Sequence, residues 1–138
     1  MIQKTLNINP APKDRTRQIG KTWRRRLTDR TRAYQDAIRF ALKDEQPFKK
    51  GEPLILWVHF YVPMPQSWSK ARRERMESEL CGRAKGDIDN LLKAFMDGLQ
   101  PSPVPNDAQI AAVGTSRRYS REPRVEFLLR ADGEGIKR

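Results

Sequence analysis

The stretch LILWVHFYV, residues 54–62, decides how this chain folds. Its even-numbered positions are all apolar, whereas the odd-numbered ones mix isoleucine with Trp57, His59 and Tyr61. Because successive side chains of a strand point to opposite faces, the stretch predicts a strand with one face in the core and an amphipathic opposite face. Pro53 and Pro63 bound the strand, since proline interrupts a sheet ladder. We expect Trp57 in the core and His59 in a structural role.

Three elements are expected upstream of this strand. Residues 5–9 alternate polar and apolar side chains, which is typical of a short half-buried strand. Residues 13–27 are rich in arginine and poor in apolar side chains, so we expect a basic loop or arm. From about Arg30 to Lys43 apolar residues recur at helical spacing, with Thr28 or Asp29 available as a cap.

Downstream, the pattern changes from helical to alternating. Ser69 can cap a short, highly charged helix that ends near Leu80, and residues 89–99 form a second helical pattern. Two strands are expected at residues 108–116 and 124–130. The apolar face of the helix expected at residues 89–99 comprises Ile88, Leu91, Leu92, Phe95 and Leu99.

Strands before, between and after helices predict an α+β fold (mixed α/β), with a mixed, mostly antiparallel sheet packed by two main helices. A length of 138 residues favours one domain, which we place at residues 1–130, followed by a flexible C-terminal tail at 131–138.

The charge of the chain indicates its class of partner. Lys and Arg number 28 against 17 Asp and Glu, which gives a formal net charge of +11. A strongly basic small domain typically binds a polyanion, and nucleic acid is the commonest one. No apolar run approaches the roughly 20 residues that span a bilayer, and no secretion signal is present, so we expect a cytoplasmic protein with no membrane partner. Cys81 is the single cysteine, which excludes an internal disulfide and a four-cysteine zinc site.

Two basic segments are candidates for DNA contacts, although either can equally be ordinary solvated surface. Trp23 and Trp68, which lie in or beside them, could stack on unpaired bases or fill the edge of the core. The candidates are Arg15, Arg17, Arg24, Arg25 and Arg26 of the basic arm, and Lys70, Arg72, Arg73 and Arg75 of the charged helix.

Aspartates gather around the helix that is expected at residues 89–99. If residues 86–90 (GDIDN) are extended, Asp87 and Asp89 point to the same side and could share a cation. Asp107 follows a proline-rich loop and could join them if the next strand lies beside the helix. Oxygen ligands of this kind suit Mg²⁺ or Mn²⁺. Lys93 lies one helical turn after Asp89, where it could contact a scissile phosphate.

A simpler interpretation of these aspartates stays open. Asp87 can be a helix cap, and Asp89, Lys93 and Asp97 can form an exposed ladder of ion pairs. However, an acidic cluster in a polyanion-binding protein repels its ligand unless a metal neutralises it. That conflict favours a metal-dependent nuclease over a non-catalytic nucleic-acid-binding module.

The segment 85–94 (KGDIDNLLKA), followed by Asp97 and by residues 106–110 (NDAQI), resembles the RusA family of Holliday junction resolvases. The similarity extends over most of the chain, and residues 64–70 (MPQSWSK) look like phage members of the family. The resemblance implies a homodimeric, Mg²⁺-dependent endonuclease that makes paired nicks across a four-way DNA junction in recombination and repair. A nuclease that prefers other branched DNA is the related alternative.

The resemblance also implies residue roles. Asp87, Asp89 and Asp107 match the metal-binding aspartates of the family, and Lys93 matches its catalytic lysine. The chain departs from the family pattern at Gly86, where proline is usual, and at Asn106, where the family has the first residue of an acidic pair.

Overall fold

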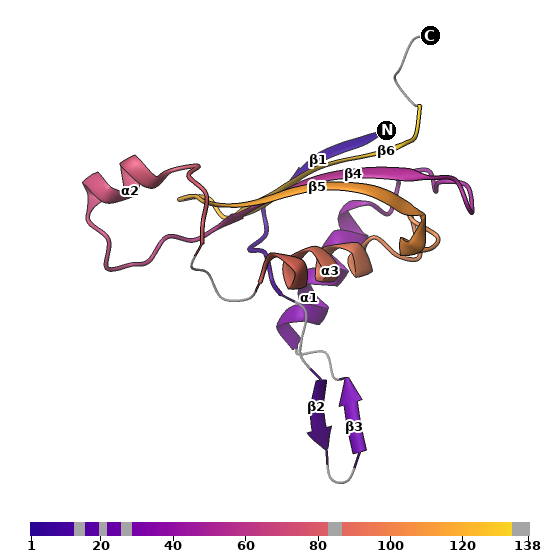
Figure 1. Cartoon of the computed structure of the whole chain (residues 1–138), viewed down its shortest axis with the longest axis horizontal. Coiled ribbons are helices and arrows are strands. Elements are labelled where there is room, and N and C mark those ends of the chain that lie inside the picture. The colour runs from indigo at the N-terminus through magenta and orange to yellow at the C-terminus, as the bar shows by residue number, and fades with distance from the viewer. Residues whose placement is uncertain (13–15, 20–21, 26–28, 83–86, 134–138) are drawn as a thin grey trace.

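The computed structural model describes residues 1–12, 16–19, 22–25, 29–82 and 87–133. A four-stranded sheet lies at its centre, in the order β1–β6–β4–β5 (Figure 1). β4 runs parallel to β5 and antiparallel to β6, and β1 pairs antiparallel with β6. The strands are β1 (Ile2–Leu6), β4 (Leu54–Val62), β5 (Ile110–Tyr119) and β6 (Arg124–Ala131).

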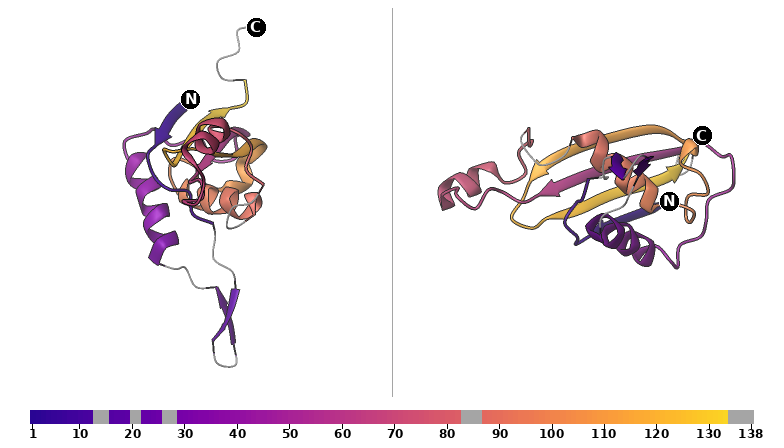
Figure 2. Two further views of the ribbon diagram at one scale, coloured as in Figure 1. Left: turned by 90° about the vertical axis from the view of Figure 1, so that its left-hand side faces the viewer. Right: turned by 90° about the horizontal axis from the view of Figure 1, so that it is seen from below.

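Two helices cover one face of this sheet. Figure 1 shows α1 (Asp29–Ala41) and α3 (Ile88–Gly98) below the strands, and Figure 2 shows both helices in front of the sheet when it is seen from below. The short α2 (Lys70–Met76) follows β4 and lies beyond the end of the sheet. The α+β fold with a mixed, mostly antiparallel sheet and two main helices is therefore confirmed.

The core forms between the helices and the sheet because β4 alternates as its sequence predicts. Its even-numbered residues are fully or almost fully buried, whereas Trp57 and His59 are exposed on the opposite face. Phe95 of α3 packs edge-on against Phe60 and Phe127, with ring centroids 6.1 and 5.1 Å away. The prediction that Trp57 lies in the core is wrong, since only one face of the sheet is covered.

The two helices are also joined to each other. The buried side chain of Gln35 in α1 donates a hydrogen bond of 3.2 Å from its Nε2 to the carbonyl oxygen of Ala94 in α3. A buried amide is stable only when it is hydrogen-bonded, so this bond fixes how α1 and α3 sit against each other. α3 is therefore held against both the sheet and a second helix.

The basic segment is a hairpin rather than a loop. β2 (Thr16–Ile19) and β3 (Thr22–Arg25) pair antiparallel, and the hairpin projects beyond the helices on the side away from the sheet (Figure 1). β-Branched and aromatic residues in this segment favour strands, which outweighed its high charge. Arg15, Gly20 and Arg26 of the predicted arm lie outside the described residues.

Several predicted boundaries shift. The N-terminal strand is Ile2–Leu6 rather than 5–9, because its register is set by pairing with β6. α1 begins at Asp29, and Thr28 lies outside the described residues. α2 is capped by Ser69 as predicted, since its side chain accepts from the Arg72 amide at 3.2 Å, but the helix ends at Met76.

The C-terminal half differs in detail from its sequence pattern. A 3₁₀ turn, η1 (Asp107–Gln109), precedes β5, and β5 continues to Tyr119. Ile88 begins α3 but is 37% exposed, so it does not share the buried face of Leu91, Phe95 and Leu99. β6 includes Ala131, the first residue of the predicted tail, and residues 134–138 lie outside the described residues.

Within the part of the chain that the structure describes, no helix is long and apolar enough to cross a membrane.

Candidate active site

Asp87 and Asp89 lie together at the N-terminal end of α3. Asp87 is the N-cap residue and has an extended backbone (φ −78°, ψ 156°), whereas Asp89 lies in the first turn of the helix. The segment is therefore not extended through Asp89, and the condition under which strand alternation would place both carboxylates on one side is not met. Both side chains are nevertheless exposed at the same helix end, so both carboxylates remain accessible to a ligand. Gly86 lies outside the described residues.

The carboxylate of Asp87 is not used as a helix cap. An N-cap aspartate ordinarily accepts a hydrogen bond from an amide of the first turn. Here the backbone carbonyl of Asp87 accepts from the amides of Asn90 and Leu91, at 3.1 Å each, and its side chain makes no capping bond. The cap interpretation therefore does not explain this residue.

The ion-pair interpretation fails at the first step of the ladder. Within the described residues, neither Asp89 nor Lys93 takes part in an ion pair, and the Oδ1 of Asp89 accepts only from the neighbouring amide of Asn90, at 3.0 Å. Lys93 is exposed and lies one turn along α3 from Asp89, a rise of about 6 Å. The helix end thus presents acidic and basic groups that are not paired with each other.

Asn106 and Asp107 have different surroundings. The side chain of Asn106 caps η1, because its Oδ1 accepts from the Ala108 amide at 2.9 Å. The backbone amide of Asp107 donates to Oε1 of Gln100 at 3.1 Å, and its carboxylate has no hydrogen-bond or ion-pair partner within the described residues. Of this pair, Asp107 is the residue whose side chain remains available to a ligand.

Asp107 lies at the opposite end of α3 from Asp87 and Asp89. Gln100, which accepts a hydrogen bond from the Asp107 amide, lies two residues beyond Gly98, the last residue of α3, and 11 helical residues span about 16 Å. Consistently, the described residues contain no group of three or more His, Cys, Asp or Glu side chains that could hold a metal ion. One protomer therefore does not bring the three aspartates together.

A hollow beside the first turn of α3 contains a basic residue that the sequence did not single out. It has a volume of about 390 Å³ and is lined on one side by Leu91 of α3 and on others by Pro10, Met64 and Tyr119. The exposed Arg30 of α1 also lines it. Arg30 carries no distinguishing sequence signal, because it is one of 28 Lys and Arg residues.

The basic residues of α2 that are predicted to contact DNA lie in two different environments. Lys70, Arg72 and Arg75 are exposed, and the Arg72 guanidinium lies 4.2 Å from the centre of the Trp68 ring. Arg73 instead donates hydrogen bonds to the carbonyl oxygens of Trp68 and Pro65, at 3.3 and 2.9 Å. Arg73 therefore fastens the loop before α2.

The hairpin brings arginine positions together along its backbone. Arg17 pairs with Arg24, and Thr16 pairs with Arg25, in the β2–β3 register. The contact of this segment with DNA stays a prediction.

Comparisons with known proteins identify the family of this chain. Over 81 residues the chain is 35% identical to the uncharacterized protein YqaN of Bacillus subtilis (strain 168), a match that covers 56% of this chain. The same match covers 57% of YqaN, so it spans just over half of that relative's length. The family model for endodeoxyribonuclease RusA matches residues 7–130, which include α3, η1 and the central sheet except β1 and the last residue of β6. This chain belongs to the RusA endodeoxyribonuclease family.

Proposed function

We propose that this chain is a Mg²⁺-dependent, structure-selective endodeoxyribonuclease that resolves four-way DNA junctions by paired symmetric nicks, in DNA recombination and repair. Family membership supports hydrolysis of DNA, and the net charge of +11 supports a polyanionic substrate. The observation that carries the proposal is the set of aspartates at α3, because Asp87 makes no capping bond and Asp107 has no side-chain partner within the described residues.

The donor set fits Mg²⁺, for which Mn²⁺ could substitute. Carboxylate oxygens are hard ligands, and a site with few carboxylates leaves positions on Mg²⁺ open for water and for phosphate oxygens. Asp87, Asp89 and Asp107 are the residues that would hold it. When bound, the ion would supply Lewis acidity to the scissile phosphate and lower the pKa of a nearby water.

Lys93 supplies the positive charge next to these carboxylates. Its ammonium group would bind a phosphate oxygen and offset the charge that develops during in-line attack. Because the side chain is exposed and forms no ion pair within the described residues, it can reach the phosphate without breaking a bond. Attack by water at phosphorus would leave nicks with 5′-phosphate and 3′-hydroxyl ends.

A homodimer would complete the site. α3 separates Asp107 from Asp87 and Asp89 within one protomer, so we infer that Asp107 of one subunit joins Asp87 and Asp89 of the other. Apolar side chains on the outer side of α3 and on the edge strand β5 support contact there, since Ile88 is 37% and Val113 40% exposed. Two helices packed antiparallel across a twofold axis would form two equivalent sites, one for each of two symmetry-related DNA strands.

The test is a nicking assay on a mobile synthetic four-way junction with Mg²⁺, run beside a linear duplex of the same sequence. We expect paired nicks at the junction, no cleavage of the duplex, no cleavage in EDTA and no cleavage by Asp89→Asn. The variant should still bind the junction, because the substitution removes a carboxylate and no basic residue.

Other outcomes separate the alternatives. Binding of the junction without cleavage in Mg²⁺ or Mn²⁺ would contradict the nuclease and favour a non-catalytic nucleic-acid-binding module. Faster cleavage of flaps or forks than of four-way junctions would retain the chemistry and reassign the substrate to another branched DNA.

A further inference from the structure

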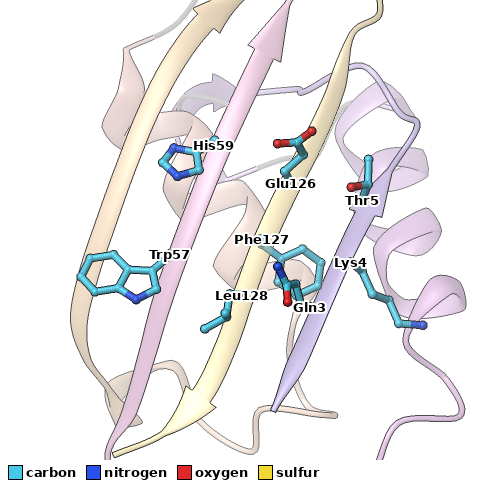
Figure 3. Close-up of a pocket in the computed structure, with 8 residues that line it drawn as sticks. All are labelled: Gln3, Lys4, Thr5, Trp57, His59, Glu126, Phe127 and Leu128. Carbon is cyan, nitrogen blue, oxygen red and sulfur yellow. The ribbon is translucent and has the colours of Figure 1, made fainter. Parts of the chain in front are cut away.

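The sheet has a second face that neither α1 nor α3 covers. Strand register places four rows of side chains on it, because directly opposite residues share a face. The central rows are Ser116, His59, Glu126 and Thr5, followed by Gly114, Trp57, Leu128 and Gln3. Figure 3 shows this face, with Trp57 and His59 on β4 and their rings directed toward β5. We call it the open face.

Trp57 is exposed, and its ring packs against the neighbouring strand. The residue is 44% exposed, and its ring lies against Gly114 of β5. A Cβ atom at position 114 would lie 2.0 Å from two ring carbons, so only glycine leaves room for this placement. An exposed aromatic ring that already packs against a neighbouring strand can bind a flat ligand with less loss of side-chain entropy than a ring without such a contact.

Polar groups surround this ring. The open face is hollowed between β4 and β1, with a volume of about 470 Å³, and Gln3, Thr5 and Glu126 offer hydrogen-bonding groups there (Figure 3). His59 is held in place because its Nδ1 is hydrogen-bonded to Oγ of Ser116, at 2.7 Å. An apolar ring beside fixed donors and acceptors is typical of sites that bind nucleobases.

The open face is also basic. Register places Arg118 and Arg124 on either side of Tyr61, and Arg130 opposite Ile55. Arg124 forms an ion pair with Glu126 at 2.9 Å and stacks on the Tyr61 ring at 3.8 Å, so the charge of Glu126 is offset locally. Among the described residues, these rows of the face hold three arginines and one carboxylate, that of Glu126, which Arg124 offsets. The excess of arginine attracts an anionic backbone.

We propose that the open face binds an unpaired nucleotide of single-stranded DNA, with the base stacked on Trp57. This inference rests on the proposed function only in taking DNA as the polyanion, and it assigns a second contact on the opposite side of the sheet from α3. A second copy of the chain fits this face less well, because the arginines of two copies would face one another.

The experiment measures the binding of a fluorescently labelled oligothymidylate, and of an abasic oligonucleotide of the same length, by anisotropy in EDTA. We expect wild-type protein to prefer the oligothymidylate. Trp57→Leu should weaken oligothymidylate binding about five-fold or more and leave abasic binding unchanged, since stacking one base contributes roughly 1–3 kcal/mol. Trp57→Phe should retain much of the preference.

Phe40→Leu is the matched control, because Phe40 is an exposed aromatic residue on α1, away from the open face. It should bind both oligonucleotides as the wild type does. Melting temperatures of all variants are compared first, and Trp57→Val, which also lacks an aromatic ring and suits a strand, serves as the test variant if Trp57→Leu fails to fold.

Equal affinity of wild type and Trp57→Leu for oligothymidylate would overturn the inference, as would an equal loss of affinity for both oligonucleotides in that variant. A change of oligomeric state in Trp57→Leu, measured by sedimentation, would assign the face to a second copy and overturn it too. Junction nicking by the same proteins tests the proposed nuclease separately. If the wild type shows no base preference but nicks junctions, only the open-face inference fails. If the wild type shows the base preference but nicks no junction, only the nuclease proposal fails.

Discussion

The backbone amide of Asp107 is hydrogen-bonded to Oε1 of Gln100 at 3.1 Å, and this bond ties the start of η1 to the C-terminal end of α3. The carbonyl oxygens of Gln100 and Asp97 in turn accept from the Arg39 guanidinium of α1, at 3.0 and 3.2 Å. Asp107 is therefore placed by the helix pair, and the position of the carboxylate that we propose as a metal ligand depends on a bond made by its own backbone.

Gln100→Leu is expected to act through Asp107. Losing one hydrogen bond removes about 0.5–1.5 kcal/mol of positional restraint, so the Mg²⁺ concentration for half-maximal nicking should rise several-fold while the melting temperature changes little. Single-turnover nicking across a Mg²⁺ titration measures this. Gln66→Leu, on an exposed loop, is the control. A loss of rate that is equal at every Mg²⁺ concentration would mean that Gln100 does not position a ligand.

The sequence predicts this fold well where one pattern determines one element. β4 has the predicted bounds because its alternation and its flanking prolines agree, and α3 differs by one residue at each end. β1 is displaced by three residues, because pairing with β6 sets its register and single-strand alternation does not. Trp57 was misplaced for a related reason: alternation identifies two faces but cannot show which of them a helix will cover.

The site was predictable as a set of residues but not as an arrangement. Spacing identified Asp87, Asp89 and Lys93 as neighbours, and they are neighbours through the first turns of α3. Whether Asp107 lies beside Asp87 and Asp89 depends on the path of the loop after α3, which residue spacing does not reveal. The hydrogen bond between Gln100 and the Asp107 amide holds this loop at the C-terminal end of the helix. The unused capping position of Asp87 could not be read from sequence, since an aspartate before a helix ordinarily caps it.

Gly98 and Ile38 limit how closely α1 and α3 approach. A Cβ atom at position 98 would lie 2.8 Å from Cδ1 and 3.3 Å from Cβ of Ile38. Gly98→Ala should therefore destabilise the protein by about 1 kcal/mol, because overpacking exceeds the gain in helix propensity. In an Ile38→Val background, which lacks Cδ1, the same change should be neutral or stabilising. Urea unfolding of the four proteins measures the coupling, and simple additivity would contradict the contact.

Tyr34 predicts how stability depends on alkaline pH. Its hydroxyl is buried without a partner in the described residues, and burial raises the pKa of Tyr34 above its ordinary value. The folded state then holds its proton to higher pH than the unfolded state does. Stability is complete below the unfolded pKa of about 10 and falls above it, by up to roughly 1.4 kcal/mol per pH unit.

Tyr34→Phe should remove this contribution. Its free energy of unfolding, measured by urea titration from neutral to alkaline pH, should fall less steeply above pH of about 10 than that of the wild type. At neutral pH the variant should be as stable or slightly more stable, because it no longer buries an unpaired hydroxyl. Parallel curves for the two proteins would show that another group controls the alkaline transition.

Lys70 and Arg73 should differ although both lie on α2. Lys70 is exposed, so Lys70→Ala should weaken junction binding and reduce the slope of log K against log salt by about one ion, without changing the melting temperature. Arg73 donates to Trp68 and Pro65, so Arg73→Ala should lower the melting temperature by a few degrees, as loss of two hydrogen bonds predicts. Identical effects of both substitutions would contradict this division.

Mixing two inactive variants tests whether a site is shared between subunits. Asp87→Asn and Asp107→Asn should each abolish nicking and retain junction binding. If each site takes Asp87 from one subunit and Asp107 from the other, a mixed dimer carries both lesions in one site and leaves the second site intact. Random exchange makes half of the dimers mixed, so about a quarter of the wild-type sites should return.

The product should be single nicks rather than paired ones, resolved on a denaturing gel, with exchange verified by native mass spectrometry. An inactive mixture of fully exchanged subunits would place all three aspartates in one protomer or remove Asp107 from the site.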